Sequence, residues 1–173
     1  MKKVILYIAT SLDGFVADEK GKVDWLEKYT GKDIEKDYSK FIKGISSIIM
    51  GRVTYKQILG FNLWPYKKIP CYVLSHKKMK IFENSNIEFY SEDIKKLLTK
   101  VKRKSKKNIW LLGGANVAQK FLKEGLVDEI QLAIIPETLG KGIHLFKKIE
   151  NKLKLIKIEK MKNGVIITHY KIK

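Results

Sequence analysis

The stretch Ile109-Trp110-Leu111-Leu112-Gly113-Gly114-Ala115-Asn116-Val117-Ala118 decides how this 173-residue chain is expected to fold. An apolar run enters two glycines, and the residues after them follow a helical pattern. A strand that ends in Gly-Gly at the start of a helix lets a ligand approach the bare main chain closely. Unpaired N–H groups at the positive end of the helix dipole favour an anion there. The stretch therefore indicates a phosphate site, or else a plain tight turn from strand to helix.

A second turn of this kind follows Ile45–Met50, where an apolar strand runs into Gly51 and a helical pattern begins at Arg52. The planar guanidinium suits a phosphate, and Thr54 adds a hydroxyl near the same helix terminus. Arg52 is one of only two arginines among 36 basic residues, so a lysine-rich composition does not account for it. The alternative is a threonine cap beside a solvated arginine.

The first two thirds of the chain alternate strands with helices. Lys3–Ala9 is a continuous apolar run, typical of a strand that is buried on both faces, and we expect it near the centre of a sheet. Further strands are expected at Ile45–Met50, Pro70–Ser75, Ile87–Tyr90 and Ile109–Leu112; helices are expected over the spaced apolar residues Ile34, Tyr38, Phe41, Ile42 and Ile45, from Arg52, behind a cap at Ser91–Asp93, and after Gly114.

After Gly125 the pattern changes to strands with little helix between them, at Glu129–Ile135, Leu153–Lys160 and Val165–Ile172. Asn163-Gly164 predicts a hairpin with a type I′ turn, which needs positive φ at both positions. The expected fold is an α/β single domain over residues 1–173, with a mostly parallel central sheet flanked by helices and an antiparallel C-terminal hairpin.

The formal net charge of +18 raises the hypothesis of a basic nucleic-acid-binding module. The positive charge is nearly all lysine and is spread along the whole chain. Its densest run, from Lys95 to Lys107, lacks interleaved aromatic residues for base stacking. We interpret it as a solvated face and expect no nucleic-acid partner.

The single cysteine, Cys71, excludes a disulfide within the chain and any zinc-ligand spacing, so no metal site is expected. No secretory signal is apparent, and the apolar runs are shorter than a membrane span. We expect a cytoplasmic protein without a membrane partner.

Six segments in a fixed order carry a resemblance to a known family. They are Ser11–Ala17, Val23–Leu26, Ile49–Tyr55, Tyr72–His76, Leu112–Ala115 and Pro136–Gly142. Together they resemble the dihydrofolate reductase superfamily, and most closely its small reductase branch related to the C-terminal reductase domain of riboflavin biosynthesis. The resemblance covers almost the full length and implies a dihydrofolate-reductase-like fold.

The resemblance also implies NADPH as cofactor. The three segments that would bind it begin at Gly51, Ser75 and Gly113, where predicted strands end. Open α/β sheets bind ligands at the carboxyl ends of their strands. Donors beside the adenosine 2′-phosphate would favour NADPH over NADH. Carried over by position, Gly51, Arg52 and Thr54 would contact phosphates, Ser75 and His76 with Lys77 nearby would lie by the 2′-phosphate or form only a polar loop, and Gly113, Gly114, Ala115 and Asn116 would line the pyrophosphate and nicotinamide ribose.

The catalytic acid is harder to assign. Dihydrofolate reductases use a carboxylate on the first helix, preceded by a Trp-x-x-Pro loop that this chain lacks. Glu35 and Asp37 flank the apolar stripe of the expected first helix, and both are otherwise ordinary solvated acids. Asp13 is a third candidate, with an Asx-type turn as its alternative role. Trp25 is expected to pack in the core rather than over the substrate.

We therefore predict an NADPH-dependent reductase that transfers a hydride to a flat nitrogen heterocycle of the pteridine, folate or ribosylaminopyrimidine type. A nucleotide-binding protein of the same fold without turnover is the alternative, and the nucleic-acid module is a third. Because related small reductases are commonly dimeric and the C-terminal strands leave an edge, we also expect a homodimer through these strands. Lysines such as Lys157 and Lys171 offer the alternative of a charged, protected edge.

Overall fold

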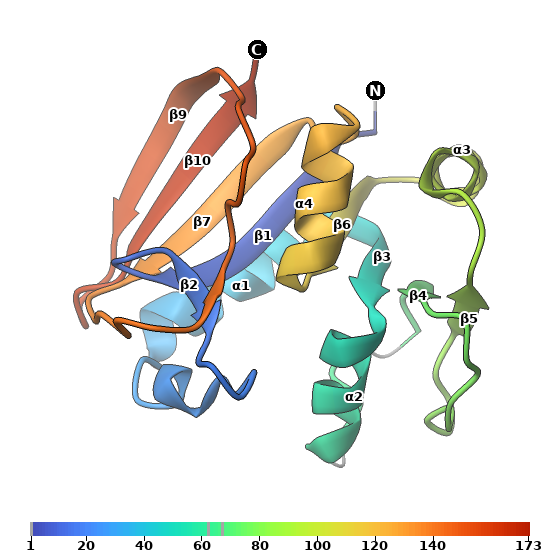
Figure 1. Ribbon diagram of the computed structural model, residues 1–173, viewed down its shortest axis with the longest axis horizontal. Helices are drawn as coiled ribbons and strands as arrows, with labels where there is room; N and C mark the ends of the chain where they lie inside the picture. The colour runs from blue at the N-terminus through green and yellow to red at the C-terminus, as the bar shows by residue number, and fades with distance from the viewer. Residues whose placement is uncertain (1, 62, 67) are drawn as a thin grey trace.

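The computed structural model describes residues 2–61, 63–66 and 68–173. Its centre is an eight-stranded sheet in the order β5-β4-β3-β6-β1-β7-β10-β9 (Figure 1). The six strands from β5 to β7 are mutually parallel, and β10 and β9 add an antiparallel hairpin at one edge. This arrangement confirms the predicted sheet, including the central place of the first strand. The strands are β1 Val4–Ser11, β3 Ile45–Gly51, β4 Cys71–Leu74, β5 Ile87–Tyr90, β6 Asn108–Gly113, β7 Glu129–Ile135, β9 Leu153–Lys160 and β10 Ile166–Ile172.

Helices cover both faces of the sheet. They are α1 Lys32–Lys43, α2 Arg52–Gly60, α3 Ile94–Lys104 and α4 Ala115–Lys123, with a short 3-10 helix, η1, at Asp24–Leu26. The apolar sides of α3 and α4 pack on one face, around Leu6 and Leu111, whereas α1 and α2 pack on the other, around Trp110. Figure 1 shows α4 in front of the sheet and α1 behind it. Within the described parts of the chain, no helix combines the length and the apolar character needed to cross a bilayer.

The first helix ends earlier than its apolar spacing predicts. The N–H of Gly44 closes the last turn on the carbonyl of Phe41 at 2.9 Å, and the next residue already belongs to β3. Ile45 is buried in the sheet, where it pairs with Asn108, so its helical spacing from Ile42 was misleading.

The turn of the C-terminal hairpin also differs from the prediction. Gly164 has φ +88°, but Asn163 keeps a negative φ, which rules out the type I′ turn. The N–H of Met161 bonds to the carbonyl of Val165 at 2.8 Å, and the N–H of Gly164 returns to the carbonyl of Met161 at 3.1 Å. These bonds close a three-residue loop, the next most common hairpin connection, in which only the glycine needs the left-handed conformation.

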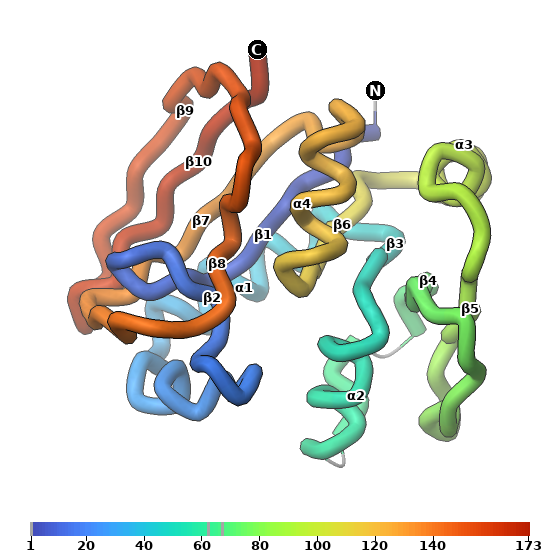
Figure 2. The backbone as a smooth tube through the Cα atoms, in the orientation of Figure 1, coloured from blue at the N-terminus to red at the C-terminus, as the bar shows by residue number. Residues whose placement is uncertain are grey.

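A second, two-stranded sheet was not expected from the sequence. It pairs β2 (Phe15–Ala17) with β8 (Ile143–His144), two segments for which the sequence predicted no strand. The ring of Phe15 stacks on that of His144 with centroids 4.0 Å apart. Gly142 fits because a Cβ there would lie 2.2 Å from the carbonyl oxygen of Ala17. Figure 2 shows how the segment between β7 and β9 rises in front of the sheet and carries β8 past β2.

Asp13 ties the loop after β1 to this crossing segment. Its carboxylate accepts hydrogen bonds from the Ser11 hydroxyl at 2.6 Å, from the N–H of Leu139 at 3.1 Å and from the N–H of Gly140 at 2.8 Å. These donors hold the pKa of Asp13 below its ordinary value, the Ser11 hydroxyl contributing most. Asp13 therefore anchors the loop to the distant 139–140 segment, whereas the N–H of Phe15, which an Asx-type turn would use, bonds to the Ser11 hydroxyl.

We expect Asp13→Asn to lower the melting temperature, because the amide retains only part of these bonds. Since the folded-state pKa is lowered, the carboxylate stabilises the fold above the ordinary aspartate pKa and loses that contribution as the pH falls through the folded value. Thermal unfolding should show a constant gap between wild type and variant from about pH 5 to 7, closing below about pH 4. A gap that persists in acid would contradict this role.

Candidate functional site

Two helices begin at the same cleft, at the carboxyl ends of neighbouring strands. Gly51 is the N-cap of α2 and Gly114 is the N-cap of α4; neither helix has a side-chain cap or an acidic residue in its first turn. By contrast, Asp93 caps α3 by accepting from the N–H groups of Lys95 and Lys96. The first N–H groups of α2 and α4 therefore keep their positive dipole ends uncompensated by a carboxylate, which suits an anionic ligand.

The two turns lie in direct contact. A Cβ on Gly51 would lie 2.8 Å from Cγ2 of Val117, and a Cβ on Gly114 would lie 3.2 Å from Oγ1 of Thr54. Gly113 has φ +109°, a conformation that favours glycine, and its peptide bond to Gly114 is cis. The packing and the backbone conformation of the two turns therefore favour glycine at these positions. As a consequence, the main chain at the surface of the cleft carries no side chains there.

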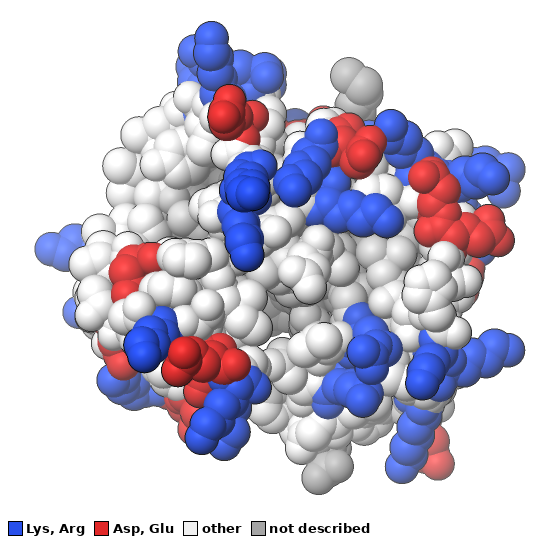
Figure 3. Space-filling model, in the orientation of Figure 1, with Lys and Arg blue, Asp and Glu red and all other residues white. Residues whose placement is uncertain are grey.

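A cavity of about 360 Å³ lies against these turns, and we call it the glycine chamber. Gln57 closes one side by donating to the carbonyl of Gly21 at 2.5 Å. Figure 3 shows a hollow in the middle of this face, where α2 and α4 begin, with Lys and Arg spread around it. Of the predicted cofactor residues, Gly51, Arg52, Thr54, Gly114, Ala115 and Asn116 line this chamber together with Ile8, Ala9, Val16, Ala17, Gly21, Val23, Leu26, Val53, Gln57, Leu74, Leu112, Val117 and Ile143.

The segment after β4 is placed beside the chamber, but its serine is occupied. The Ser75 hydroxyl donates to the carbonyl of Lys77 at 2.6 Å and accepts from the N–H of Lys77 at 3.0 Å. It is buried, whereas His76 and Lys77 are exposed. Ser75 therefore shapes the turn, and only its two neighbours present their side chains to solvent. Neither these residues nor Gly113 line the cavity, although Leu74 does.

A second cavity, of about 240 Å³, lies on the α1 side of β1. We call it the tyrosine chamber. It shares Ile8, Ala9 and Leu26 with the glycine chamber, so the two cavities adjoin along the end of β1 and η1. Its other lining residues are Tyr7, Tyr29, Ile34, Tyr38, Trp110, Ala133, Ile135, Val165 and Ile167. Trp25 lies next to it, half-buried against Ile135, Val165 and Ile167.

The three candidate carboxylates are not brought together. Glu35 is exposed on α1, and Asp13 is occupied as a loop anchor. Asp37 alone is connected to the tyrosine chamber, because its carboxylate accepts a hydrogen bond of 3.1 Å from the hydroxyl of Tyr7. Burial raises the pKa of the Tyr7 phenol, and the charge of Asp37 raises it further. The sequence analysis missed Tyr7, whose only signal was a polar tip inside an apolar strand.

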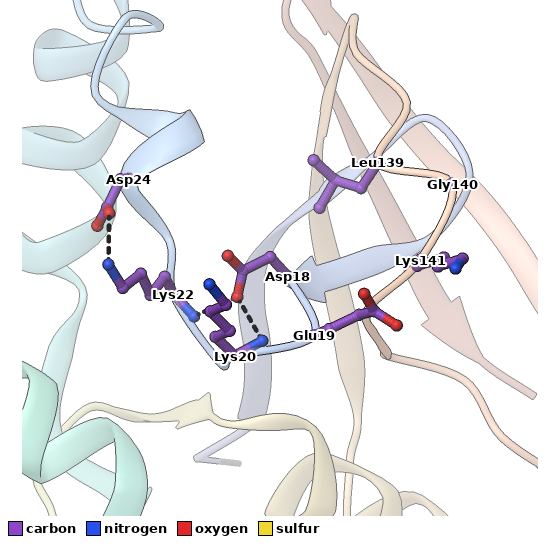
Figure 4. A pocket seen from close by; sticks show the side chains of 8 residues that line it. All are labelled: Asp18, Glu19, Lys20, Lys22, Asp24, Leu139, Gly140 and Lys141. Carbon is purple, nitrogen blue, oxygen red and sulfur yellow. Dashed lines mark hydrogen bonds and ion pairs between the residues drawn. The ribbon is translucent and has the colours of Figure 1, made fainter.

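A charged depression on the surface has a different character. It lies between the turn at Asp18–Asp24 and the loop at Leu139–Lys141. Figure 4 shows its side chains spread around an open space, with Lys22 paired to Asp24 at 4.0 Å. The Asp18 carboxylate accepts from the main-chain N–H of Lys20 at 2.8 Å. Among the described residues, no group of three or more His, Cys, Asp or Glu side chains is placed to hold a metal ion.

The sequence and the fold both match known proteins. The model of the RibD C-terminal domain family matches residues 2–167. The uncharacterized protein YwjB of Bacillus subtilis (strain 168) is 34% identical over 171 residues, which cover 98% of this chain and 97% of YwjB. The crystal structure of a putative riboflavin biosynthesis protein from Shewanella sp. PV-4 superposes with a TM-score of 0.86 at 30% identity, covering 99% of both chains.

More distant structures share the fold. A diaminohydroxyphosphoribosylaminopyrimidine deaminase/5-amino-6-(5-phosphoribosylamino)uracil reductase from Thermotoga maritima has a TM-score of 0.76 at 17% identity, covering 99% of this chain and 57% of that one. Dihydrofolate reductase from Enterococcus faecalis, complexed with NADP(H) and RAB-propyl, has a TM-score of 0.70 at 16% identity, covering 99% and 96%. The suspected resemblance is confirmed: with its own dihydrofolate-reductase-like fold and a match from residue 2 to 167, this chain belongs to the RibD C-terminal domain family.

Proposed function

We propose that this protein is an NADPH-dependent reductase that transfers a hydride to a small, flat nitrogen heterocycle. The observation that carries the proposal is the pair of adjoining chambers. One chamber has two uncapped helix starts, bare glycines and Arg52, and the other is apolar with three tyrosines. They share Ile8, Ala9 and Leu26, so ligands bound in the two chambers would meet along this wall.

The cofactor fits the glycine chamber on chemical grounds. Phosphate oxygens are acceptors for the free N–H groups of both helix starts and for the Arg52 guanidinium. Bound NADPH would supply the hydride, and the residues of the chain would bind and orient it. The Enterococcus dihydrofolate reductase, which shares the fold, was solved in complex with NADP(H), and this supports the choice of cofactor.

The choice between NADPH and NADH is assigned to the exposed residues after β4. His76 and Lys77 are free to approach an adenosine 2′-phosphate, whereas the Ser75 hydroxyl is already bonded within its own turn. We therefore expect these two side chains, with Ser75 as a positioning residue, to favour NADPH. Each charge-assisted contact contributes about 1.5–3 kcal/mol, which is roughly tenfold or more in affinity.

We expect Gly114→Ala to weaken NADPH binding by about tenfold or more, because the added methyl occupies the approach to the α4 start and presses on Thr54 at 3.2 Å. Gly60→Ala is the matched control, since a methyl group added there, at the far end of α2, would have no atom within 4 Å. Cofactor fluorescence titration of wild type and both variants gives the dissociation constants. Unchanged affinity in folded Gly114→Ala protein would make the cofactor assignment wrong.

Proton supply is assigned to the Asp37–Tyr7 pair. The phenol of Tyr7 lines the tyrosine chamber, and its hydroxyl is held by the hydrogen bond to Asp37. In the proposed relay, the O–H proton of Tyr7 passes to a nitrogen of the reduced heterocycle, and solvent returns a proton to the phenol oxygen. Asp37 positions the hydroxyl by accepting its hydrogen bond at 3.1 Å.

Replacing Tyr7 with Phe should lower kcat by about 10²–10⁴-fold without changing NADPH affinity, because general acid catalysis contributes on that order. Asp37→Asn should also lower kcat. Glu35→Gln, on the exposed side of the same helix, should leave kcat unchanged. The assay is oxidation of NADPH with a panel of pterins and pyrimidines. Wild-type kcat in Tyr7→Phe would refute the relay, and NADPH binding without turnover of any panel member would favour the nucleotide-binding alternative.

The C-terminal hairpin supports the proposal of a homodimer. The register of β9 and β10 places Leu153, Leu155, Ile158 and Ile166 on one face, each between 38% and 56% exposed. Figure 3 shows an uncharged surface over this hairpin. On the opposite face, the Glu159 carboxylate pairs with both Lys157 and His169. Aliphatic side chains gathered on an exposed sheet face favour association with a second copy.

Sedimentation equilibrium should return about twice the monomer mass of 20.1 kDa. Ile158→Lys should shift the protein to the monomer, because it introduces a charge into the apolar face. Ile156→Lys is the matched control and should leave the dimer intact. The Ile156 side chain is 57% exposed, against 56% for Ile158, but it borders a hollow on the other face of the hairpin, together with His169. A wild-type monomer across the micromolar range would reject the dimer and leave the lysines as protection of the edge.

A further inference from the structure

We infer that the tyrosine chamber takes a small planar ring system that carries no phosphate or carboxylate inside it. This inference rests on the proposed reductase function and narrows its substrate. A phosphoribosyl group, such as the one in the name of the Thermotoga reductase, would have to lie outside this chamber.

The lining of the chamber provides no partner for an anion. The structure describes every one of the lining residues, and none of them carries a charge at neutral pH. Most of the surface is aliphatic or aromatic carbon, including Ile34, Ala133 and Ile167. An anionic group placed against such a surface loses its hydration without gaining a hydrogen-bonded counter-ion, which is strongly unfavourable.

Two charged groups border this lining, and both already have partners. Asp37 accepts from Tyr7 at 3.1 Å, and its negative charge would repel an anion. Lys28 lies over the ring of Tyr29 with its ammonium 5.5 Å from the ring centroid, but the same ammonium is 2.7 Å from the carboxylate of Glu137. The ammonium of Lys28 is thus paired with a carboxylate rather than free to bind an anion.

The glycine chamber shows what a phosphate site looks like in the same molecule. Arg52 lines it, and the two uncapped helix starts open into it. Both features are missing from the described lining of the tyrosine chamber. The anion-binding capacity of the cleft therefore lies on the cofactor side of the shared wall.

Size and polar groups define what the tyrosine chamber does accept. Its volume of about 240 Å³ is below the range of about 300–1,000 Å³ typical for drug-sized ligands, which favours one or two fused rings. Its side-chain polar groups are the hydroxyls of Tyr7, Tyr29 and Tyr38, and the indole of Trp110, which donates to the carbonyl of Tyr7 at 2.9 Å. Tyr38 makes no hydrogen bond within the described residues, so its hydroxyl remains available to a ring nitrogen or carbonyl.

A pair of pterins that differ by one charge tests the inference. Isothermal titration calorimetry measures the affinities of 6-methylpterin and 6-carboxypterin for the full-length protein, with and without saturating NADP⁺. We expect 6-methylpterin to bind at least about tenfold more tightly. Equal or tighter binding of the carboxylate, or no binding of either pterin, would overturn the inference.

Variants test whether the pterin binds in the tyrosine chamber. Ile34→Lys adds a cation to the chamber and should narrow or reverse the preference, whereas the uncharged Ile34→Met should keep it. Should Ile34→Lys fail to fold, Tyr38→Phe, which removes one hydroxyl, should weaken 6-methylpterin binding several-fold and keep the preference. A preference that folded Ile34→Lys protein leaves unchanged, or a 6-methylpterin affinity that Tyr38→Phe leaves unchanged, would show that the pterin binds elsewhere and would overturn the assignment.

Binding of NADPH, measured on the same samples, separates this inference from the proposed function. If NADPH does not bind but the preference for 6-methylpterin holds and responds to Ile34→Lys, the reductase function is wrong and the chemistry of the chamber stands. If NADPH binds and 6-carboxypterin binds as tightly as 6-methylpterin, the function stands and the substrate class is wrong.

Discussion

The contact between the turn after β3 and the turn after β6 is the constraint on which the site depends. Val117 packs where a side chain on residue 51 would lie, and Thr54 packs where one on residue 114 would lie. Two glycines let the two helix starts approach this closely, because a Cβ on residue 51 would overlap Val117 and a Cβ on residue 114 would press on Thr54. The same packing leaves bare main chain and two positive dipole ends at the cleft. A single packing requirement thus yields both the local fold and a surface that suits an anionic ligand.

β1 extends this constraint to the substrate side. It lies between β6 and β7, with Leu6 facing the α3 and α4 core and Tyr7 facing α1. The next two residues toward the cleft, Ile8 and Ala9, separate the two chambers. The loop after β1 is then held by Asp13 on one side and by Gln57 on Gly21 at the other. Residues of one strand therefore divide the cleft into a half that holds Arg52 and two helix starts and a half whose lining carries no charge.

Most of the fold could be predicted because its signals are local. Continuous apolar runs and the glycines after them located the strands and the helix starts, and the Glu129–Ile135 and Leu153–Lys160 strands were predicted at their observed bounds. The errors come from long-range competition. Ile45 has helical spacing from Ile42 but pairs with Asn108 in the sheet. The hairpin at Asn163 has a three-residue loop instead of the predicted two-residue turn. The β2–β8 pair depends on a close approach between residues 17 and 142, which no local pattern reveals.

The candidate site was predictable where backbone chemistry defines it and unpredictable where partners do. Gly51 and Gly114 could be predicted from the strand-to-helix turns. The hydrogen bonds of Ser75 to Lys77 and of Asp13 to the 139–140 loop could not, because they form only when the chain is folded. Asp37 could not be separated from Glu35 until Tyr7 was placed beside it.

The most direct test of the central claim, that two adjoining chambers form one reductase site, is a crystal structure of the protein with NADP⁺. The account predicts the pyrophosphate at the starts of α2 and α4, in contact with Arg52 and Gly114, and the nicotinamide ring against Ile8 and Ala9 with one face toward the tyrosine chamber. A cofactor bound elsewhere, or a nicotinamide turned away from that wall, would contradict the claim.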